Sequence, residues 1–295
     1  MAIRKNKSEG IFNFINAIIM ILMIIICIYP LLYVTFASLS EPSKLMQHTG
    51  PLLSPLGFTL KGYELVLQNR DIATGYANTI FYVVVGTAVN LIMTSLGAYV
   101  LSRKNAYWVN KMMLFIAFTM FFGGGTIPYF LIIKGLGGIN HRWTQIIPGA
   151  ISTWNLIVMR TSFATIPVSL EESAKLDGAS DFTILFKIIL PLSTPVLAVM
   201  ALFYGVGHWN SWFGAMLFLR HRSMYPLQLI LREILISNST QSTMVQSGIN
   251  EGQTDIYALL VQYSTIIVAT VPILLIYPFL QKYFVKGVMV GAIKE

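Results

Sequence analysis

The chain has 295 residues, of which 55% are hydrophobic and only 11% are charged, and its formal net charge is +8. Soluble domains carry about 25% charged residues, so one soluble core could not bury this much apolar surface, and a membrane protein is indicated. The basic residues lie between long apolar runs rather than in one patch. This distribution argues against nucleic acid as a partner and favours a role of the charge in membrane topology.

Six apolar runs are long enough to be membrane helices, since a spanning helix needs about 20 mainly apolar residues. They lie at approximately 12–38, 77–101, 112–133, 144–160, 191–219 and 257–281. The fourth is the least regular because Pro148, Asn155 and Arg160 interrupt it. The first follows a basic stretch, as a signal peptide would, but its apolar run exceeds the usual length of about 7–15 residues. We therefore expect it to be a retained span.

Six spans place both termini on one side of the membrane. An N-terminus in the cytoplasm leaves the larger share of the 20 Lys and Arg residues inside, which is the orientation that the positive-inside rule favours. We expect an all-α polytopic protein of the bacterial cell membrane, with residues 1–295 as one transmembrane domain. The two long outer segments, about 39–76 and 220–256, are either simple connectors or surfaces for a partner.

The segment 169–195, SLEESAKLDGASDFTILFKIILPLSTP, has the most specific pattern. Ser169 and Glu172 have the spacing of a capping box, which predicts a helix start, and Gly178 predicts its left-handed end. A second, amphipathic helix is expected after Ser180, with one apolar face formed by Phe182, Leu185, Phe186 and Ile189. The first helix is too short to be stable alone in water, so it needs a surface to pack on. From these patterns alone, an ordinary capped surface loop is an equal alternative.

The same segment resembles the EAA loop of permease subunits of ATP-binding-cassette importers. The family pattern is Glu-Ala-Ala, three residues, Gly, nine residues, Ile, one residue and Leu-Pro. The chain matches it with Glu172-Ser173-Ala174, Gly178, Ile188 and Leu190-Pro191, and Ser173 is the one departure. The strings LEESAKLDGA, LPLSTPVLA, YPLQLILREIL and VKGVMVGAIKE are similar to the sugar-importer branch (carbohydrate uptake type 1), near the second permease of maltose-type and oligosaccharide systems. The resemblance extends from about Phe58 to the end.

The resemblance implies a type I importer permease fold, half of a translocation path for a carbohydrate, and a loop at 169–190 that couples the chain to a separate ATPase. Glu172 would pair with a basic group of the ATPase, and Gly178 would make the break in the loop. The coupling residues implied are Glu172, Ser173, Ala174, Leu176, Asp177, Gly178, Ala179 and Phe182. The implied partners are a second homologous permease subunit, two ATPase subunits that bind ATP and Mg, an extracellular solute-binding protein and the lipid bilayer.

The sequence has no Gly-x-x-x-x-Gly-Lys-Ser/Thr loop and no His/Cys cluster with metal spacing, so we expect neither an enzyme nor a cofactor or metal on this chain. The predicted spans hold no Asp or Glu, and carriers driven by ion gradients usually need such groups. A secondary sugar carrier is therefore the weaker alternative, and a non-transporting scaffold or sensor is a third. His208, within the fifth span, is better explained by a helix–helix hydrogen bond or by an interfacial position than by a proton relay.

Polar and aromatic side chains in the spans are the candidates for a sugar path, because sugars combine apolar C–H faces with hydroxyls that need partners. Each such residue more often serves helix packing than ligand contact. The candidates are Asn78, Tyr82, Asn90, Trp154, Asn155, Trp209, Asn210 and Trp212.

Overall fold

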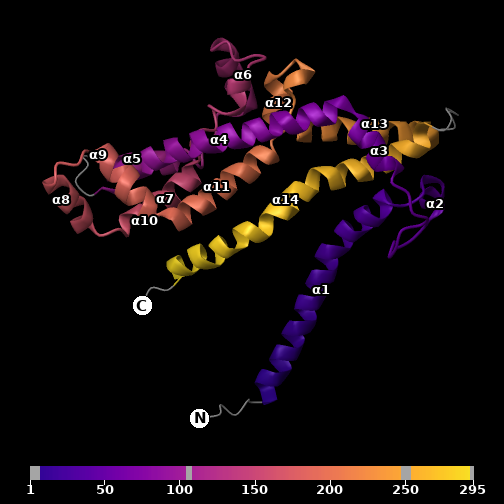
Figure 1. Ribbon diagram of the computed structural model, residues 1–295, viewed down its shortest axis with the longest axis horizontal. Coiled ribbons are helices and arrows are strands. Elements are labelled where there is room, and N and C mark those ends of the chain that lie inside the picture. Colours follow the sequence, from indigo (N-terminus) through magenta and orange to yellow (C-terminus); the bar gives the residue numbers. More distant parts are fainter. Residues whose placement is uncertain (1–6, 104–107, 247–253, 293–295) are drawn as a thin grey trace. The chain divides into compact units, whose positions relative to one another are not determined.

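The computed structural model describes residues 7–103, 108–246 and 254–292, and within them the chain is helical apart from turns and one isolated bridge between Ser40 and Phe58. Figure 1 shows the helices in chain order. They are α1 (Lys7–Ser38), α2 (Pro42–Gln47), α3 (Lys61–Gln68), α4 (Arg70–Ser102), α5 (Val109–Phe118), α6 (Thr126–Gly135), η1 (Arg142–Gln145), α7 (Thr153–Ala164), α8 (Val168–Leu176), α9 (Asp181–Ile184), η2 (Leu185–Ile189), α10 (Leu190–Leu192), α11 (Thr194–Trp209), α12 (Phe213–Phe218), η3 (Arg222–Met224), α13 (Leu227–Gln246) and α14 (Thr254–Ala292). The all-α prediction is confirmed for the described residues.

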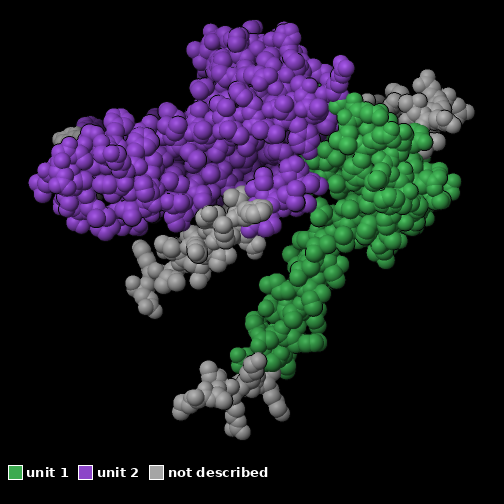
Figure 2. All heavy atoms as spheres, in the orientation of Figure 1, with its two compact units in different colours: residues 1–69, 233–270 green, residues 70–232, 271–295 purple. Residues whose placement is uncertain are grey.

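The chain divides into two compact units, drawn in different colours in Figure 2. Unit 1 comprises residues 1–69 and 233–270, and unit 2 comprises 70–232 and 271–295. Unit 2 contains the predicted coupling loop and all the candidate path residues. The expectation of a single transmembrane domain over 1–295 stays a prediction.

Three of the predicted spans are long apolar helices. They are Glu9–Ser38 in α1, all of α4, and Tyr257–Ile276 in α14. A fourth apolar stretch is bent rather than straight, because Asp181–Leu192 meets Thr194–Trp209 at 87°. By length and composition, the described residues thus contain three helices able to cross a membrane, or four if the bent pair is one span.

The other three predicted spans, at 112–133, 144–160 and 191–219, are not continuous helices, and the count of six spans stays a prediction. The first is split into α5 and α6 by residues 119–125, which include the run Gly123–Gly125, and Gly125 has a φ of +81°. The second starts as η1, and α7 begins only after Pro148 and Gly149. The third separates into α10, α11 and α12. Proline and glycine disfavour a continuous helix because of their backbone properties. The mean hydropathy of a run does not detect these breaks.

The two long outer segments also contain helices, α2 and α3 in the first and α13 in the second. The second outer segment, about 220–256, lies partly outside the described residues, as do both termini of the chain.

The core of unit 2 is built where α4 packs against α7 and α11. Fully buried apolar side chains fill this contact, among them Met159, Phe163 and Met200. One close approach depends on a glycine, since a Cβ on Gly86 would lie 2.4 Å from Nε2 of His208. This bundle is the body on which the predicted coupling loop rests.

Unit 1 has a smaller core around Ala37, Leu45 and Leu52. The hydroxyls of Ser38 and Tyr63 are hydrogen-bonded at 2.7 Å, which ties the end of α1 to α3. The apolar stretch of α1 before this point has none of its residues buried within the described structure. Its side chains are therefore available to lipid or to another subunit.

Candidate functional site

The predicted coupling loop begins with α8, and its end is formed as the sequence predicts. Gly178 has a φ of +81°, the left-handed conformation that favours glycine. Its N–H donates to the carbonyl of Lys175 at 3.0 Å, and the N–H of Ala179 donates to the carbonyl of Ala174 at 2.9 Å. These two bonds define a Schellman motif. Gly178 therefore stops the helix sharply and turns the chain toward α9.

The start of α8 differs from the prediction. Pro167 occupies the N-cap position with a φ of −57°, no side chain caps the helix, and Ser169 already lies inside it. The proposed capping box of Ser169 and Glu172 is therefore wrong. The proline ring fixes φ close to the helical value, so the chain enters the helix at Val168, before Ser169 could act as a cap.

The second helix begins where expected, but its buried face is not the expected one. Ser180 caps α9 by accepting a hydrogen bond from the N–H of Thr183 at 3.3 Å. Leu185 and Ile189 are buried, whereas Phe182 and Phe186 are exposed. The predicted common face assumed a regular α-helix, but η2 is a π-helical turn. Its wider winding changes the direction of the side chains along the segment.

The eight predicted coupling residues divide into two groups. Ala174 and Ala179 are half-buried and pack against the apolar core of unit 2. The other six, Glu172, Ser173, Leu176, Asp177, Gly178 and Phe182, are exposed. The apolar side chains of Leu176 and Phe182 are 90% and 68% exposed. The loop thus rests on one side and presents an apolar and acidic surface on the other, which we call the docking face (Glu172, Ser173, Leu176 and Phe182).

A buried carboxylate in α8 was missed by the sequence reasoning. The side chain of Glu171 is 8% exposed. Its Oε2 pairs with Nη1 of Arg103, directly after α4, and its Oε1 accepts from Nζ of Lys175 at 3.2 Å and from the hydroxyl of Tyr99 at 3.3 Å. Lys175 also pairs with Asp181 at 3.5 Å. We call these five residues the Glu171 network.

Within this network the charged form of Lys175 is favoured. Hydrogen bonding to Glu171 raises the pKa of Lys175 above its usual value of 10.5, and the charge of Asp181 adds to this rise. The Arg103 guanidinium lies 4.8 Å from the centre of the Tyr99 ring. The spacing of Glu171 and Lys175, four residues apart in one helix, was the sequence signal that could have indicated the network.

Asn78 and Tyr82 of the predicted sugar path instead tie α4 to the segment around η3. The amide of Asn78 donates to the carbonyls of Ser223 and Tyr225 at 2.8 and 3.0 Å, and its Oδ1 accepts from Arg142 at 2.9 Å. The hydroxyl of Tyr82 donates to the carbonyl of Met224 at 2.9 Å. Both side chains are buried and hydrogen-bonded within the chain, as expected for residues that hold helices together.

Asn90 has the same role deeper in α4. Its Nδ2 donates to the carbonyls of Gly149 and Ala150 at 2.6 and 3.0 Å, and its Oδ1 lies 2.7 Å from Nε2 of His208. The predicted helix–helix hydrogen bond of His208 is thereby confirmed. His208 and Tyr82 also line a narrow crevice together with Gln145, Ser211 and Pro226.

The remaining candidates are not gathered around one cavity. Asn155 and Trp209 are buried, Trp154 and Asn210 are exposed, and Trp212 is half-buried with the Arg232 guanidinium 4.1 Å from its ring centre. Their role in a sugar path stays a prediction.

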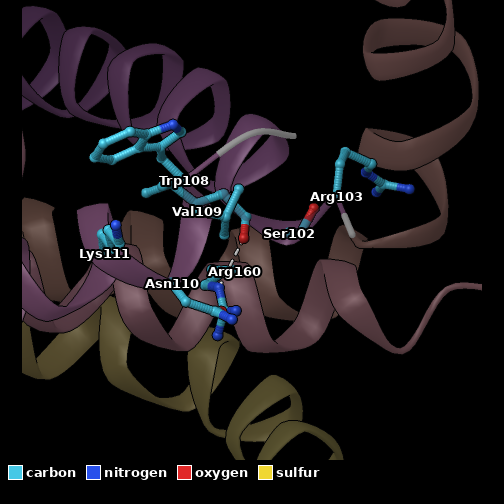
Figure 3. A pocket seen from close by; sticks show the side chains of 8 residues that line it. Ser102, Arg103, Trp108, Val109, Asn110, Lys111 and Arg160 are labelled. Atoms are coloured by element: carbon cyan, nitrogen blue, oxygen red, sulfur yellow. Dashed lines mark hydrogen bonds between the residues drawn. The ribbon is translucent and has the colours of Figure 1, made fainter. Parts of the chain in front are cut away.

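A larger hollow of about 470 Å³ lies beside the end of α4 (Figure 3). It is lined by Leu101, Ser102, Arg103, Trp108, Val109, Asn110, Lys111 and Arg160. The Nε of Arg160 donates to the carbonyl of Leu101 at 2.8 Å, and Figure 3 draws this bond as a dashed line from Arg160. None of the predicted path residues lines it. Among the described residues no group of three His, Cys, Asp or Glu side chains could hold a metal ion.

The chain is similar to known transport proteins along most of its length. It is 38% identical over 93% of its residues to the polygalacturonan/rhamnogalacturonan transport system permease protein YtcP of Bacillus subtilis, covering 95% of that protein. It is 36% identical to Protein LplC of the same organism, over 98% of this chain and 96% of that one.

Among solved structures, a chain of a bacterial ABC transporter involved in the import of the acidic polysaccharide alginate superposes with a TM-score of 0.85 and 33% identity, over 96% of this chain and 100% of that one. Residues 106–290 match the family described as binding-protein-dependent transport system inner membrane component. The match includes α8, the residues Lys175 and Asp181 of the Glu171 network, and the docking face. The chain therefore belongs to the family of inner membrane components of binding-protein-dependent transport systems.

Proposed function

We propose that the chain is the membrane-spanning permease subunit of an ATP-driven carbohydrate importer and that its loop 169–190 couples it to a separate ATPase subunit. The observation that carries this proposal is the docking face. Leu176 and Phe182 are exposed on either side of the glycine stop, while the opposite side of the loop rests on the bundle of α4, α7 and α11. Exposed apolar groups on a firmly supported loop are typical of a protein–protein contact.

The assembly follows from this role. The chain has no ATP-binding loop of its own, so two ATPase subunits that bind ATP and Mg supply the energy. A second homologous permease completes the translocation path, of which this chain forms half. An extracellular binding protein delivers the substrate. The loop 169–190 then lies in the cytoplasm, with six membrane passages and both termini on that side.

The substrate class that we propose is an acidic oligosaccharide. Two similar proteins support it: the permease YtcP is named for polygalacturonan and rhamnogalacturonan, and the solved transporter imports the acidic polysaccharide alginate. The net charge of +8 is compatible with an anionic substrate. Cells that express the complete transporter are expected to take up labelled oligogalacturonate, and unlabelled oligogalacturonate should compete better than neutral maltodextrin. Stronger competition by maltodextrin would contradict the acidic class.

The coupling role is tested by changing the docking face. Leu176→Glu places a charge on an apolar contact, and the loss of one contact hot spot of about 2 kcal/mol lowers affinity by more than tenfold. We expect at least a tenfold loss of ATPase subunit recovered with the purified permease. Leu53→Glu is the matched control, because Leu53 is also an exposed leucine but lies in unit 1. Equal recovery from both variants would refute the docking face.

The side of the membrane is tested by labelling. Cys27 is the one cysteine of the chain, so a Cys27→Ser background allows a single reporter at Glu172→Cys. A membrane-impermeant maleimide should label it only after the cells are permeabilised. Labelling of intact cells would place the loop outside and refute ATPase coupling. Sugar uptake from an ion gradient by the permease without ATPase would instead support a secondary carrier.

A further inference from the structure

Glu171 lies next to Glu172 in the sequence but in a different environment. The Glu172 side chain belongs to the exposed docking face, whereas the Glu171 side chain is 8% exposed and faces the end of α4. A carboxylate in such a place is stable only when cations and hydrogen-bond donors compensate its charge. Here Arg103, Lys175 and Tyr99 do so.

The partners of Glu171 come from three different parts of unit 2. Tyr99 and Arg103 belong to the last turn of α4 and the residue after it, and Lys175 belongs to α8 itself. Lys175 continues the network to Asp181, the first residue of α9. One carboxylate thus connects the helix before Gly178, the helix after it and the end of the long helix α4.

Arg103 depends strongly on this carboxylate. Its side chain is 15% exposed, and its Nε and Nη2 atoms are buried with no hydrogen-bond partner among the described residues. The remaining support that the structure gives the guanidinium is the ring of Tyr99. Because a buried cation left without its counter-ion is strongly unfavourable, neutralising Glu171 would loosen Arg103 as well as α8.

The apolar contacts of α8 are slight by comparison. Within the predicted coupling set, the core contacts come from Ala174 of α8 and from Ala179, which follows Gly178, and both residues are small. A helix of nine residues with so little apolar burial is not held by packing alone. The charged contact is therefore the main connection between α8 and α4.

We propose that Glu171 is a positioning residue that fixes the docking face to the end of α4, so that displacement of α8 by the ATPase moves α4 rather than bending the loop. This inference rests on the proposed coupling role of the loop and assigns the second acidic residue of the segment a role distinct from that of Glu172. Glu172 contacts the partner, and Glu171 passes the movement on within the chain.

The experiment uses the complete transporter, purified and reconstituted in vesicles, with ATP inside and the binding protein and sugar outside. Glu171→Gln keeps the shape of the side chain and removes its charge, and Glu172→Gln makes the same change at the adjacent exposed position. Recovery of the ATPase subunit, ATP hydrolysis and sugar uptake are each measured per assembled complex. The ratio of sugar moved to ATP hydrolysed reports coupling, which a role in folding alone would not change.

For Glu171→Gln we expect ATPase recovery within about twofold of the unsubstituted complex and a ratio of sugar to ATP at least about tenfold lower. For Glu172→Gln we expect the reverse, with lower ATPase recovery and an unchanged ratio in the complexes that form. An unchanged ratio in Glu171→Gln would overturn the inference. Loss of ATPase recovery in Glu171→Gln as large as in Glu172→Gln would overturn it too, because Glu171 would then act in docking.

A double substitution tests whether Glu171 acts through Arg103. Arg103→Gln alone leaves the carboxylate without its main counter-ion and should lower the ratio as Glu171→Gln does. With both residues neutral no unpaired charge remains, so the double variant should be no worse than either single one. Additive losses would refute the connection between the two residues. If the unsubstituted complex itself moved no sugar on ATP addition, the proposed function would fail, independently of these variants.

Discussion

Replacing Gly178 by alanine isolates the energetic cost of one backbone conformation. A Cβ at this position meets no atom within 4 Å, so the substitution causes no collision. The residue must nevertheless keep a φ of +81°, which costs an L-residue about 1–2 kcal/mol. This cost falls on the local stability of the turn after α8, and it corresponds to a factor of about 5–30 in the population of the closed turn.

Hydrogen exchange measures this population directly. The N–H groups of Gly178 and Ala179 close the Schellman motif, so their protection in Gly178→Ala should fall about 5–30-fold. Gly178→Asn should lose less, because asparagine tolerates the left-handed conformation. Gly135→Ala is the control, since Gly135 also has open space around it but no positive φ. Equal protection in Gly178→Ala and the unsubstituted chain would refute the argument from backbone conformation.

Gly178→Pro is a harsher change at the same residue. Proline fixes φ near about −65° and has no N–H, so the bond from residue 178 to the carbonyl of Lys175 is lost as well. We expect α8 to point elsewhere, with less ATPase recovered and normal membrane insertion.

Two further substitutions test the interior of unit 2, and a third tests the exposed Lys175. Asn90→Ala removes three hydrogen bonds and should lower the free energy of unfolding by about 2 kcal/mol, at roughly 0.6 kcal/mol for each bond within a membrane. Thermal unfolding in detergent measures this loss. Trp154→Ala is the control, because Trp154 is 59% exposed, and this variant should unfold almost as the unsubstituted protein does. Gly86→Ala should lower the yield of folded protein, because its Cβ would lie 2.4 Å from His208, whereas Gly205→Ala, with its nearest neighbour at 3.7 Å, should not. The pKa of Lys175 is raised above 10.5 by Glu171, so its stabilising contribution is complete below pH 10.5 and is lost as the pH rises through the folded pKa. The protection of the α8 amides from hydrogen exchange should therefore fall above pH 10.5. Lys175→Gln should remove this pH dependence.

The parts of the site that the sequence predicts correctly are those fixed by local chemistry. Gly178 ends α8 because few other residues adopt its conformation, and Ser180 caps α9 through its own hydroxyl. Both properties depend on a few neighbouring residues. The same holds for the long apolar helices α1, α4 and α14, whose hydropathy is high over the whole length.

The role of Glu171 depends instead on tertiary structure. Two adjacent glutamates in the first turn of a helix are both compatible with the helix dipole, and the sequence does not show which of them faces the end of α4. The broken spans have a similar explanation. An average over a window of residues does not detect that Gly125 has a left-handed backbone or that η1 and α7 are separated by Pro148. The exposure of Phe182 and Phe186 follows from the π-helical turn η2. An apolar pattern with a period of about 3.6 residues does not predict such a turn.

The π-helical turn Leu185–Ile189 determines where the loop tolerates a change in length. Such a turn contains one residue more than an α-helical turn. Deleting Lys187 would therefore restore regular winding and leave the direction of Phe182 nearly unchanged. The turns of α8 contain no extra residue, so a deletion there would rotate the side chains on its two sides by about 100° relative to each other, since each residue of an α-helix advances by that angle. The segment between Gly178 and Pro191 can thus lose a residue within η2 without turning the docking face, whereas α8 cannot.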